Sequence, residues 1–197
     1  MENTFKEQTS EFNIYYHQKR LEVLQRLFKN FFGTVLDIGC GHSIAGSYLP
    51  NVIGVDICSP ANASRLVKGD ALHIPIKDDS VDCVYAGEVI EHFNEQPLFL
   101  NEIRRVLKTS GLLLISTPNI TSAYGDHVKM LPYRKFKSLI SSNGFRITQV
   151  EGIYCRFFSR TGLYKKLPTR FLKKFLMNQR FPHSISYNIM FLCIKVS

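Results

Sequence analysis

The sequence predicts an α/β fold: a doubly wound, mostly parallel sheet with helices on both faces and a C-terminal antiparallel hairpin. Short apolar runs typical of buried strands alternate with longer segments of helical spacing, which is the order that parallel sheets require. The last two apolar runs, 145–154 and 186–196, are predicted to form the antiparallel pair. A length of 197 residues suits one such domain with a buried core.

The first half of the chain contains a helix and the strands that lead to a candidate site. In 13–32 the apolar residues recur at helical spacing, and Gly33 ends this predicted amphipathic helix. Apolar, β-branched residues then predict a series of short strands. In chain order the predicted segments are a strand at 34–38, a turn or short helix at 44–49, a strand at 51–57, a third segment at 68–76 that carries Asp70 at a strand end, and a strand at 80–87.

The second half continues the alternation up to the hairpin. One helix is predicted to start within 88–93, and a second is predicted to run over 96–108. Gly111 lies just past the end of the second helix. The apolar run 111–119 predicts a buried strand closed by a proline turn, and 132–143 predicts another helix.

Four predicted strand ends carry residues suited to a ligand site. Ligands of parallel sheets bind outside the carboxyl ends of the strands. The first strand ends in the bend Gly39–Gly41, where missing side chains let a backbone approach a ligand closely. The second ends in Asp56, 19 residues after Asp37, and a carboxylate there can accept both hydroxyls of a ribose. Asp70 can accept an adenine amino group, and Gly87 again permits close approach.

On these strand ends the chain resembles the class I S-adenosylmethionine-dependent methyltransferases, which have a Rossmann-like, seven-stranded-type sheet. The resemblance is carried by "VLDIGCG", "GVDI", "GDALHIPIKDDSVDCVYAGEVIEHF", "NEIRRVLKTSGLLLISTPN" and "NGFRI". It is greatest to the small-molecule branch that includes the ubiquinone-biosynthesis O-methyltransferases.

This resemblance implies S-adenosyl-L-methionine as the cofactor and a role for each matching residue. Gly39, Cys40 and Gly41 would pack against its methionine part. Asp56 would hold the ribose, Asp70 the adenine, and Arg20 the carboxylate, while Gly87 and Glu88 would line the sulfonium side. The implied cofactor-binding residues are Arg20, Asp37, Gly39, Cys40, Gly41, Asp56, Ile57, Asp70, Ala71, Gly87 and Glu88.

Two features depart from the family pattern. Ser43 follows His42 where relatives usually have a third glycine, which makes the loop more restricted or lets His42 reach the site. Only 14 residues separate Asp56 from Asp70, so the helix that relatives place there is predicted to be lost or reduced to one turn.

The catalytic base is not identified by the sequence. Glu88, Glu91 and His92 have the spacing of one helix face, which fits a general base, a divalent-metal site, or acids favoured at a helix start. We predict no metal, because the last interpretation is the simplest. His92 and His127 are the candidate bases, and a loop histidine such as His127 can equally be a solvated surface residue.

Composition indicates a cytoplasmic protein. The five cysteines are scattered without a Cys-x-x-Cys pair, as expected of reduced thiols. No apolar run reaches the roughly 18 residues needed to span a bilayer, and the polar N-terminus does not resemble a signal peptide.

The positive charge is concentrated late in the chain. Residues 128–181 contain 13 Lys and Arg against one acid, a net charge of +12, and the remainder carries −3. Within this stretch, 163–181 combines a helical apolar stripe with a basic face. It is interpreted either as a core-packing helix, as an interfacial helix on an anionic membrane, or as a clamp for an anionic substrate.

The sequence predicts a single methyltransferase domain, 1–197, with an N-terminal helical cap at 1–32 and a basic insertion at 155–186. The predicted function is methyl transfer to a small-molecule, lipid-linked or carbohydrate acceptor, at oxygen. An RNA or protein methyltransferase and a non-catalytic cofactor-binding module remain alternatives. Nucleic acid is the less favoured partner, because "YAGE" stands where enzymes that methylate base amino groups have Asn/Asp-Pro-Pro-aromatic.

Overall fold

The computed structural model describes residues 18–41, 51–58, 65–119, 128–155 and 186–196. Its seven strands form one sheet in the order β3-β2-β1-β4-β5-β7-β6. The strands are β1 Val35–Ile38, β2 Val52–Asp56, β3 Leu66–Lys68, β4 Val81–Gly87, β5 Leu107–Pro118, β6 Phe145–Cys155 and β7 Ser186–Lys195.

The predicted fold class is confirmed by the strand directions. The pairs β3–β2, β2–β1, β1–β4 and β4–β5 are parallel, whereas β7 runs antiparallel to both β5 and β6. From β1 the chain builds outward to β2 and β3, then crosses to β4 on the other side of β1. In open α/β sheets, ligands bind outside the carboxyl ends of the strands at such a reversal, which here lies at β1 and β4.

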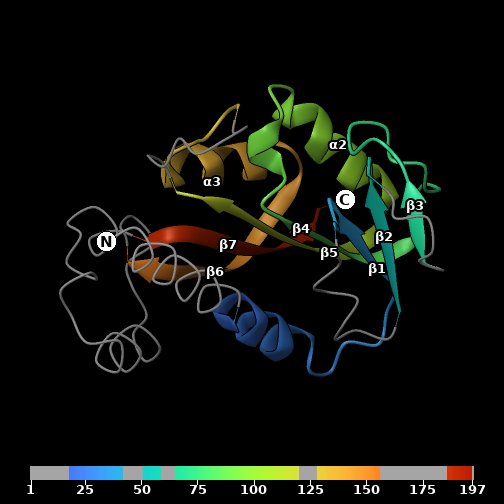
Figure 1. Ribbon diagram of the computed structural model, residues 1–197, viewed down its shortest axis with the longest axis horizontal. Helices are drawn as coiled ribbons and strands as arrows, with labels where there is room; N and C mark the ends of the chain where they lie inside the picture. Colours follow the sequence, from blue (N-terminus) through green and yellow to red (C-terminus); the bar gives the residue numbers. More distant parts are fainter. Residues whose placement is uncertain (1–17, 42–50, 59–64, 120–127, 156–185, 197) are drawn as a thin grey trace, which may run out of the picture.

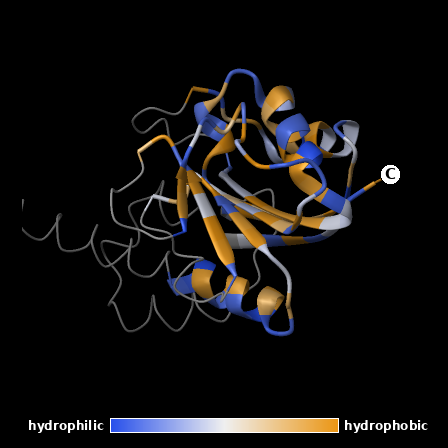
Figure 2. Ribbon diagram, turned by 90° about the vertical axis from the view of Figure 1, so that its right-hand side faces the viewer, coloured by the Kyte–Doolittle hydropathy of each residue, from blue (hydrophilic) through white to orange (hydrophobic). Residues whose placement is uncertain are grey.

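Helices cover the two faces of the sheet (Figure 1). Helices α2, Gln96–Val106, and α3, Tyr133–Ser142, lie on one face, and a helix at 18–28 lies on the other. Figure 2 shows the largely hydrophobic strands between these two layers. The helix at 18–28 packs Val23, Leu24 and Phe28 against the sheet, because these three residues follow its apolar stripe.

The predicted helix at 88–93 is wrong. The segment instead forms a single 3₁₀ turn, η2, Ile90–His92. Glu88 has a φ of +61°, a left-handed conformation that cannot start a right-handed helix. Its backbone N–H is donated across to Ser116 of β5, so strand pairing and not helix formation satisfies this residue.

The predicted boundary between helix and strand at Gly111 is also wrong. Helix α2 ends at Val106, and β5 begins at Leu107, which is fully buried and pairs with Val81 of β4. Ser110 takes a φ of +61°, and the register between β4 and β5 shifts near Val81. The tertiary anchor at Leu107 therefore overrides the helical spacing of the sequence.

Several predicted segments lie outside the described residues. These are the turn at 44–49, the shortened connection at 59–64, the loop that holds His127, and nearly all of the insertion at 155–186. The two ends of that insertion are neighbours, because Cys155 of β6 pairs with Ser186 of β7. None of the helices in the described residues is long and apolar enough to cross a membrane.

Candidate functional site

The carboxylate of Asp56 ties the end of β2 to the bend after β1. Its Oδ2 accepts the N–H of Gly41 at 2.9 Å, and its Oδ1 accepts the N–H of Cys58 at 2.8 Å. The N–H of Gly39 reaches the carbonyl of Val55 at 2.8 Å and strengthens the same junction. Each carboxylate oxygen has a further lone pair, so Asp56 can accept additional hydrogen bonds from a ligand.

The two glycines of this bend are required for different reasons. Gly39 has a φ of +64°, and a Cβ there would lie 2.5 Å from Cγ2 of Val89. Gly41 has a φ of +48°, but a Cβ there would meet no heavy atom of the described residues within 4 Å. Gly39 is thus required by its packing against Val89, whereas no described residue fills the space beside Gly41.

Buried acidic surroundings keep the thiol of Cys40 neutral. Cys40 and Asp37 are both buried below this bend. Burial raises the pKa of Cys40 to about 11, and the negative charges of Asp37 and Asp56 act in the same direction. Cys40 therefore lines the site as a small apolar group and not as a thiolate nucleophile.

A second carboxylate stands next to this junction. The N–H of Gly69 donates to the carbonyl of Asp56 at 3.1 Å, which brings Asp70 beside the end of β2. Oδ1 of Asp70 accepts the N–H of Leu72 at 2.9 Å, and this hydrogen bond lowers the pKa of Asp70. Ile57, directly after Asp56, is 67% exposed, which is unusual for a large apolar side chain, whereas Ala71 is buried.

At the end of β4 the buried side chain of Arg20 takes the space that a side chain on Gly87 would fill. Arg20 donates from Nη2 to the hydroxyl of Tyr85 at 2.6 Å and from Nη1 to Oε2 of Glu88 at 3.3 Å. A Cβ on Gly87 would overlap both the Tyr85 hydroxyl and the Arg20 guanidinium. The sequence predicts that Gly87 lets a ligand approach closely. In the structure the space beside Gly87 is occupied by the guanidinium of Arg20, which comes from the helix at 18–28.

Asn188 is a site residue that sequence reasoning missed. This fully buried residue of β7 donates from Nδ2 to Oε1 of Glu88 at 2.7 Å. Its Oδ1 and the Oγ of buried Ser116 have no hydrogen-bond partner among the described residues. The available signal was a lone amide within the apolar run 186–196, because a buried polar side chain in a strand requires a partner.

The segment 88–93 forms only a 3₁₀ turn after the left-handed Glu88, so the predicted common helix face of Glu88, Glu91 and His92 is wrong. Glu91 is fully buried, and its Oε2 accepts the hydroxyl of Thr117 at 3.3 Å. Burial raises the pKa of Glu91 to about 8, so this carboxyl carries a proton at neutral pH. Within the described residues no three His, Cys, Asp or Glu side chains gather as a metal site would require. His92 lies partly buried in η2.

Comparison with known proteins agrees with this geometry. Residues 36–115 match the family model described as a methyltransferase domain. A probable S-adenosylmethionine-dependent methyltransferase of Mycolicibacterium smegmatis is 30% identical over 161 residues, which cover 71% of this chain and 63% of that protein. A ubiquinone biosynthesis O-methyltransferase of Rhodopseudomonas palustris is 31% identical over 100 residues, which cover 43% of this chain and 40% of that protein. The chain thus spans less than two thirds of the length of both relatives.

A solved structure has the same fold over most of the chain. It is the 1,6-didemethyltoxoflavin-N1-methyltransferase of Burkholderia thailandensis with bound 1,6-didemethyltoxoflavin and S-adenosylhomocysteine. The two structures align with a TM-score of 0.63 at 15% sequence identity, over 95% of this chain and 87% of the other. The match at 36–115 and the similarity over 71% of the chain therefore identify residues 36–115 as a methyltransferase domain of the S-adenosylmethionine-dependent kind.

Proposed function

We propose that this chain binds S-adenosylmethionine and transfers its methyl group to an oxygen atom of a small-molecule acceptor. The observation that carries the proposal is the convergence of four ligand-suited strand ends at one edge of the sheet. They are the ends of adjacent strands in the order β3-β2-β1-β4, and the direct bond from Gly41 to Asp56 joins two of them.

The residues on the β1–β2 side fit the nucleoside half of this cofactor. Asp56 retains lone pairs for two ribose hydroxyls, and Asp70 offers an exposed carboxylate to an adenine amino group. The side chain of Ile57 is an exposed apolar surface, and an adenine ring packed on it would shield it from water. The space beside Gly41, which no described residue fills, leaves room for the adjoining methionine part of the cofactor.

The residues on the β4 side fit the methionine half and the reacting centre. Arg20 holds a positive charge next to Gly87, where the family resemblance places the cofactor carboxylate. The bound cofactor supplies an already activated methyl group on a sulfonium sulfur. The protein's work is therefore to align the acceptor with that group and to exclude water, and the buried network around Glu88 and Asn188 suits that task.

Oxygen as the accepting atom is supported by the similarity to the Rhodopseudomonas relative, a ubiquinone biosynthesis O-methyltransferase. A small acceptor agrees with the 1,6-didemethyltoxoflavin bound by the Burkholderia enzyme. A hydroxyl acceptor needs a base, and His92 and His127 stay the candidates for it. Contact of the basic segment 163–181 with an anionic membrane also stays a proposal.

Cofactor binding is tested by titration calorimetry with S-adenosylhomocysteine on two matched variants. Asp56→Asn and Asp82→Asn each alter a carboxylate that accepts a backbone N–H at 2.9 Å, but Asp82 lies at the opposite end of the sheet. Because hydrogen bonds to a charged group would weaken, Asp56→Asn should cost about 1.5–3 kcal/mol of binding free energy. Asp82→Asn should leave affinity unchanged; equal affinities in all three proteins would refute the assignment of Asp56.

The acceptor is tested by a screen with methyl-labelled cofactor against lipid, sugar and RNA extracts. Label in a small molecule supports the proposal, and alkaline lability of the product would identify an ester linkage. Label in RNA or protein would establish the polymer alternative. Tight cofactor binding without transfer to any extract would favour a non-catalytic module.

A further inference from the structure

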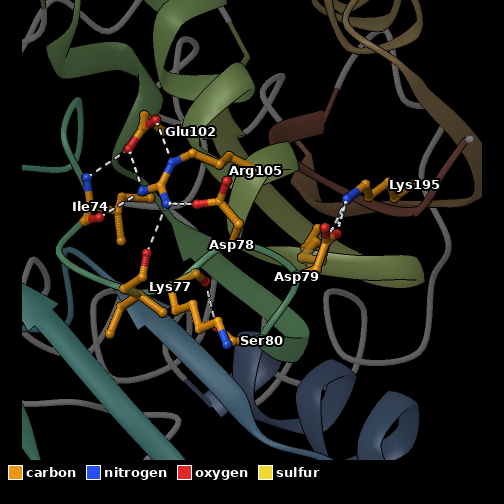
Figure 3. Close-up of polar contacts among 10 residues, drawn as sticks. Ile74, Lys77, Asp78, Asp79, Ser80, Glu102, Arg105 and Lys195 are labelled. Carbon is orange, nitrogen blue, oxygen red and sulfur yellow. Dashed lines mark hydrogen bonds and ion pairs between the residues drawn. The ribbon is translucent and has the colours of Figure 1, made fainter.

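Two side chains of α2 hold the segment that follows Asp70 (Figure 3). Oε2 of Glu102 accepts the backbone N–H of Ile74 at 2.9 Å. Nη2 of Arg105 donates to the backbone carbonyl of Ile74 at 2.7 Å. Both main-chain groups of Ile74, four residues after Asp70, are therefore bonded to one helix.

The guanidinium of Arg105 also bonds to residues that follow Ile74 in the chain. Its Nη1 donates to the carbonyl of Ile76 at 2.8 Å and to Oδ1 of Asp78 at 2.6 Å. Its Nε and Nη2 both reach the carboxylate of Glu102 at 2.8 Å, which is the bidentate geometry that fixes a planar guanidinium. The clamp, Glu102 with Arg105, thus fastens 74–78 to α2 by charge-assisted hydrogen bonds.

The segment needs such a clamp because the strand before it is weak. Strand β3 has three residues and lies at the edge of the sheet, where it pairs only with β2. Asp70 follows within a tight turn, in which the N–H of His73 donates to the Asp70 carbonyl at 3.0 Å. Ile74 comes next and is buried in the core. The turn at 70–73 is consequently held between β3 on one side and the clamp on the other.

We infer that Glu102 and Arg105 are positioning residues for the cofactor, which set the affinity for its adenosine part by fixing the turn that presents Asp70. Neither side chain contacts the ligand in this assignment. The gain is preorganisation, because a turn that is ordered before binding does not pay its ordering entropy during binding. The inference rests on the proposed function.

A purely structural role for the clamp predicts a different result, and the chain contains a matched control. Lys195 pairs with Asp79 at 2.7 Å and donates to the carbonyl of Leu107 at 2.6 Å (Figure 3). This pair holds the same connection, but at its far end beside β5 and β7. Breaking it costs a similar ion pair and backbone contact without releasing the turn at 70–73.

The test is titration of S-adenosylhomocysteine into the full chain, well below the unfolding temperature of each variant. Arg105→Lys keeps the charge but loses the planar fork, and it should weaken binding about tenfold, which equals about 1.4 kcal/mol. Glu102→Gln, a second variant of similar shape, should weaken binding in the same direction. Lys195→Met should lower thermal stability and leave affinity within twofold of wild type.

A double-mutant cycle makes the result specific for the turn. If the clamp acts through Asp70, Arg105→Lys should cost little further affinity in an Asp70→Ala background, because coupled residues are non-additive. Additive losses, or wild-type affinity in both clamp variants, would overturn the inference while leaving the proposed function standing. Failure of the wild-type protein to bind S-adenosylhomocysteine would overturn the proposed function and this inference with it.

Discussion

The two sides of the candidate site at the strand ends are built in different ways. On the β1–β2 side, one carboxylate receives backbone N–H groups, and the bond between Gly41 and Asp56 joins residues 15 positions apart. On the β4–β7 side, side chains bond to side chains, and the partners Arg20 and Glu88 are 68 positions apart, with 100 between Glu88 and Asn188. The β1–β2 side thus depends on hydrogen bonds between residues close in sequence, whereas the β4–β7 side depends on contacts between distant parts of the chain.

This difference has a consequence for exposure and for charge. The β1–β2 side keeps Ile57 and Gly41 exposed to solvent, as suits a surface that a ligand will cover. The β4–β7 side buries Arg20 and Asn188 and leaves Glu88 partly exposed. Variants at the exposed surface should therefore mainly affect binding, and variants that disturb a buried contact should mainly affect stability.

The largest expected effect is at Gly39. Valine there combines a left-handed φ with overlap of the Val89 side chain, and it should lower the free energy of unfolding by about 3 kcal/mol. Gly41→Val meets no side chain of the described residues, so it should cost about 1 kcal/mol for backbone strain. Denaturant unfolding measures both values.

Binding distinguishes these two variants further. Gly41→Val should fold and yet lose S-adenosylhomocysteine binding, because its side chain would fill the space proposed for the ligand. Wild-type affinity in Gly41→Val would show that this loop does not contact the cofactor.

The next effect concerns the buried guanidinium. Arg20→Met removes the guanidinium that donates to Glu88 and Tyr85, and the loss should be about 2 kcal/mol of unfolding free energy. The neighbouring Lys19 forms an exposed pair with Glu22, so Lys19→Met should cost less than about 0.5 kcal/mol. Thermal and denaturant unfolding compare the two, and equal losses would contradict a buried role for Arg20.

The smallest effect is a pH dependence from Glu91. Its pKa rises from 4.5 to about 8 because the carboxyl is buried, so between these values the folded protein keeps a proton that the unfolded chain has lost. The free energy of unfolding must then fall as pH rises through this window and level off above it.

Glu91→Gln removes this titration. From about pH 5 to about pH 9, the free energy of unfolding should therefore fall by about 1–2 kcal/mol less in Glu91→Gln than in wild type. Unfolding curves at the two pH values measure the change. Glu95→Gln alters an exposed carboxylate nearby and serves as the control. The same pH dependence in wild type and Glu91→Gln would show that Glu91 is ionised in the folded protein.

Most of the fold followed from periodicity. Most strands and the two later helices were predicted close to their observed bounds, because apolar alternation and glycine ends are local signals. The two errors, at 88–93 and at 107–110, both arise at the ends of β4 and α2. There a single left-handed residue or a pairing across the sheet decides the backbone, and neither is encoded in a local pattern.

By itself the sequence determined the sheet type and the β1–β2 side of the candidate site, because the glycine bend and Asp56 lie close together in the sequence, in one strand–connection–strand unit. Only the tertiary structure decided the opposite side. It turned Glu88 toward Arg20 and Asn188, and it buried Glu91 against Thr117. The physical reason is that a strand end projects its side chains by backbone φ and by cross-sheet partners, and those partners come from the two ends of the chain.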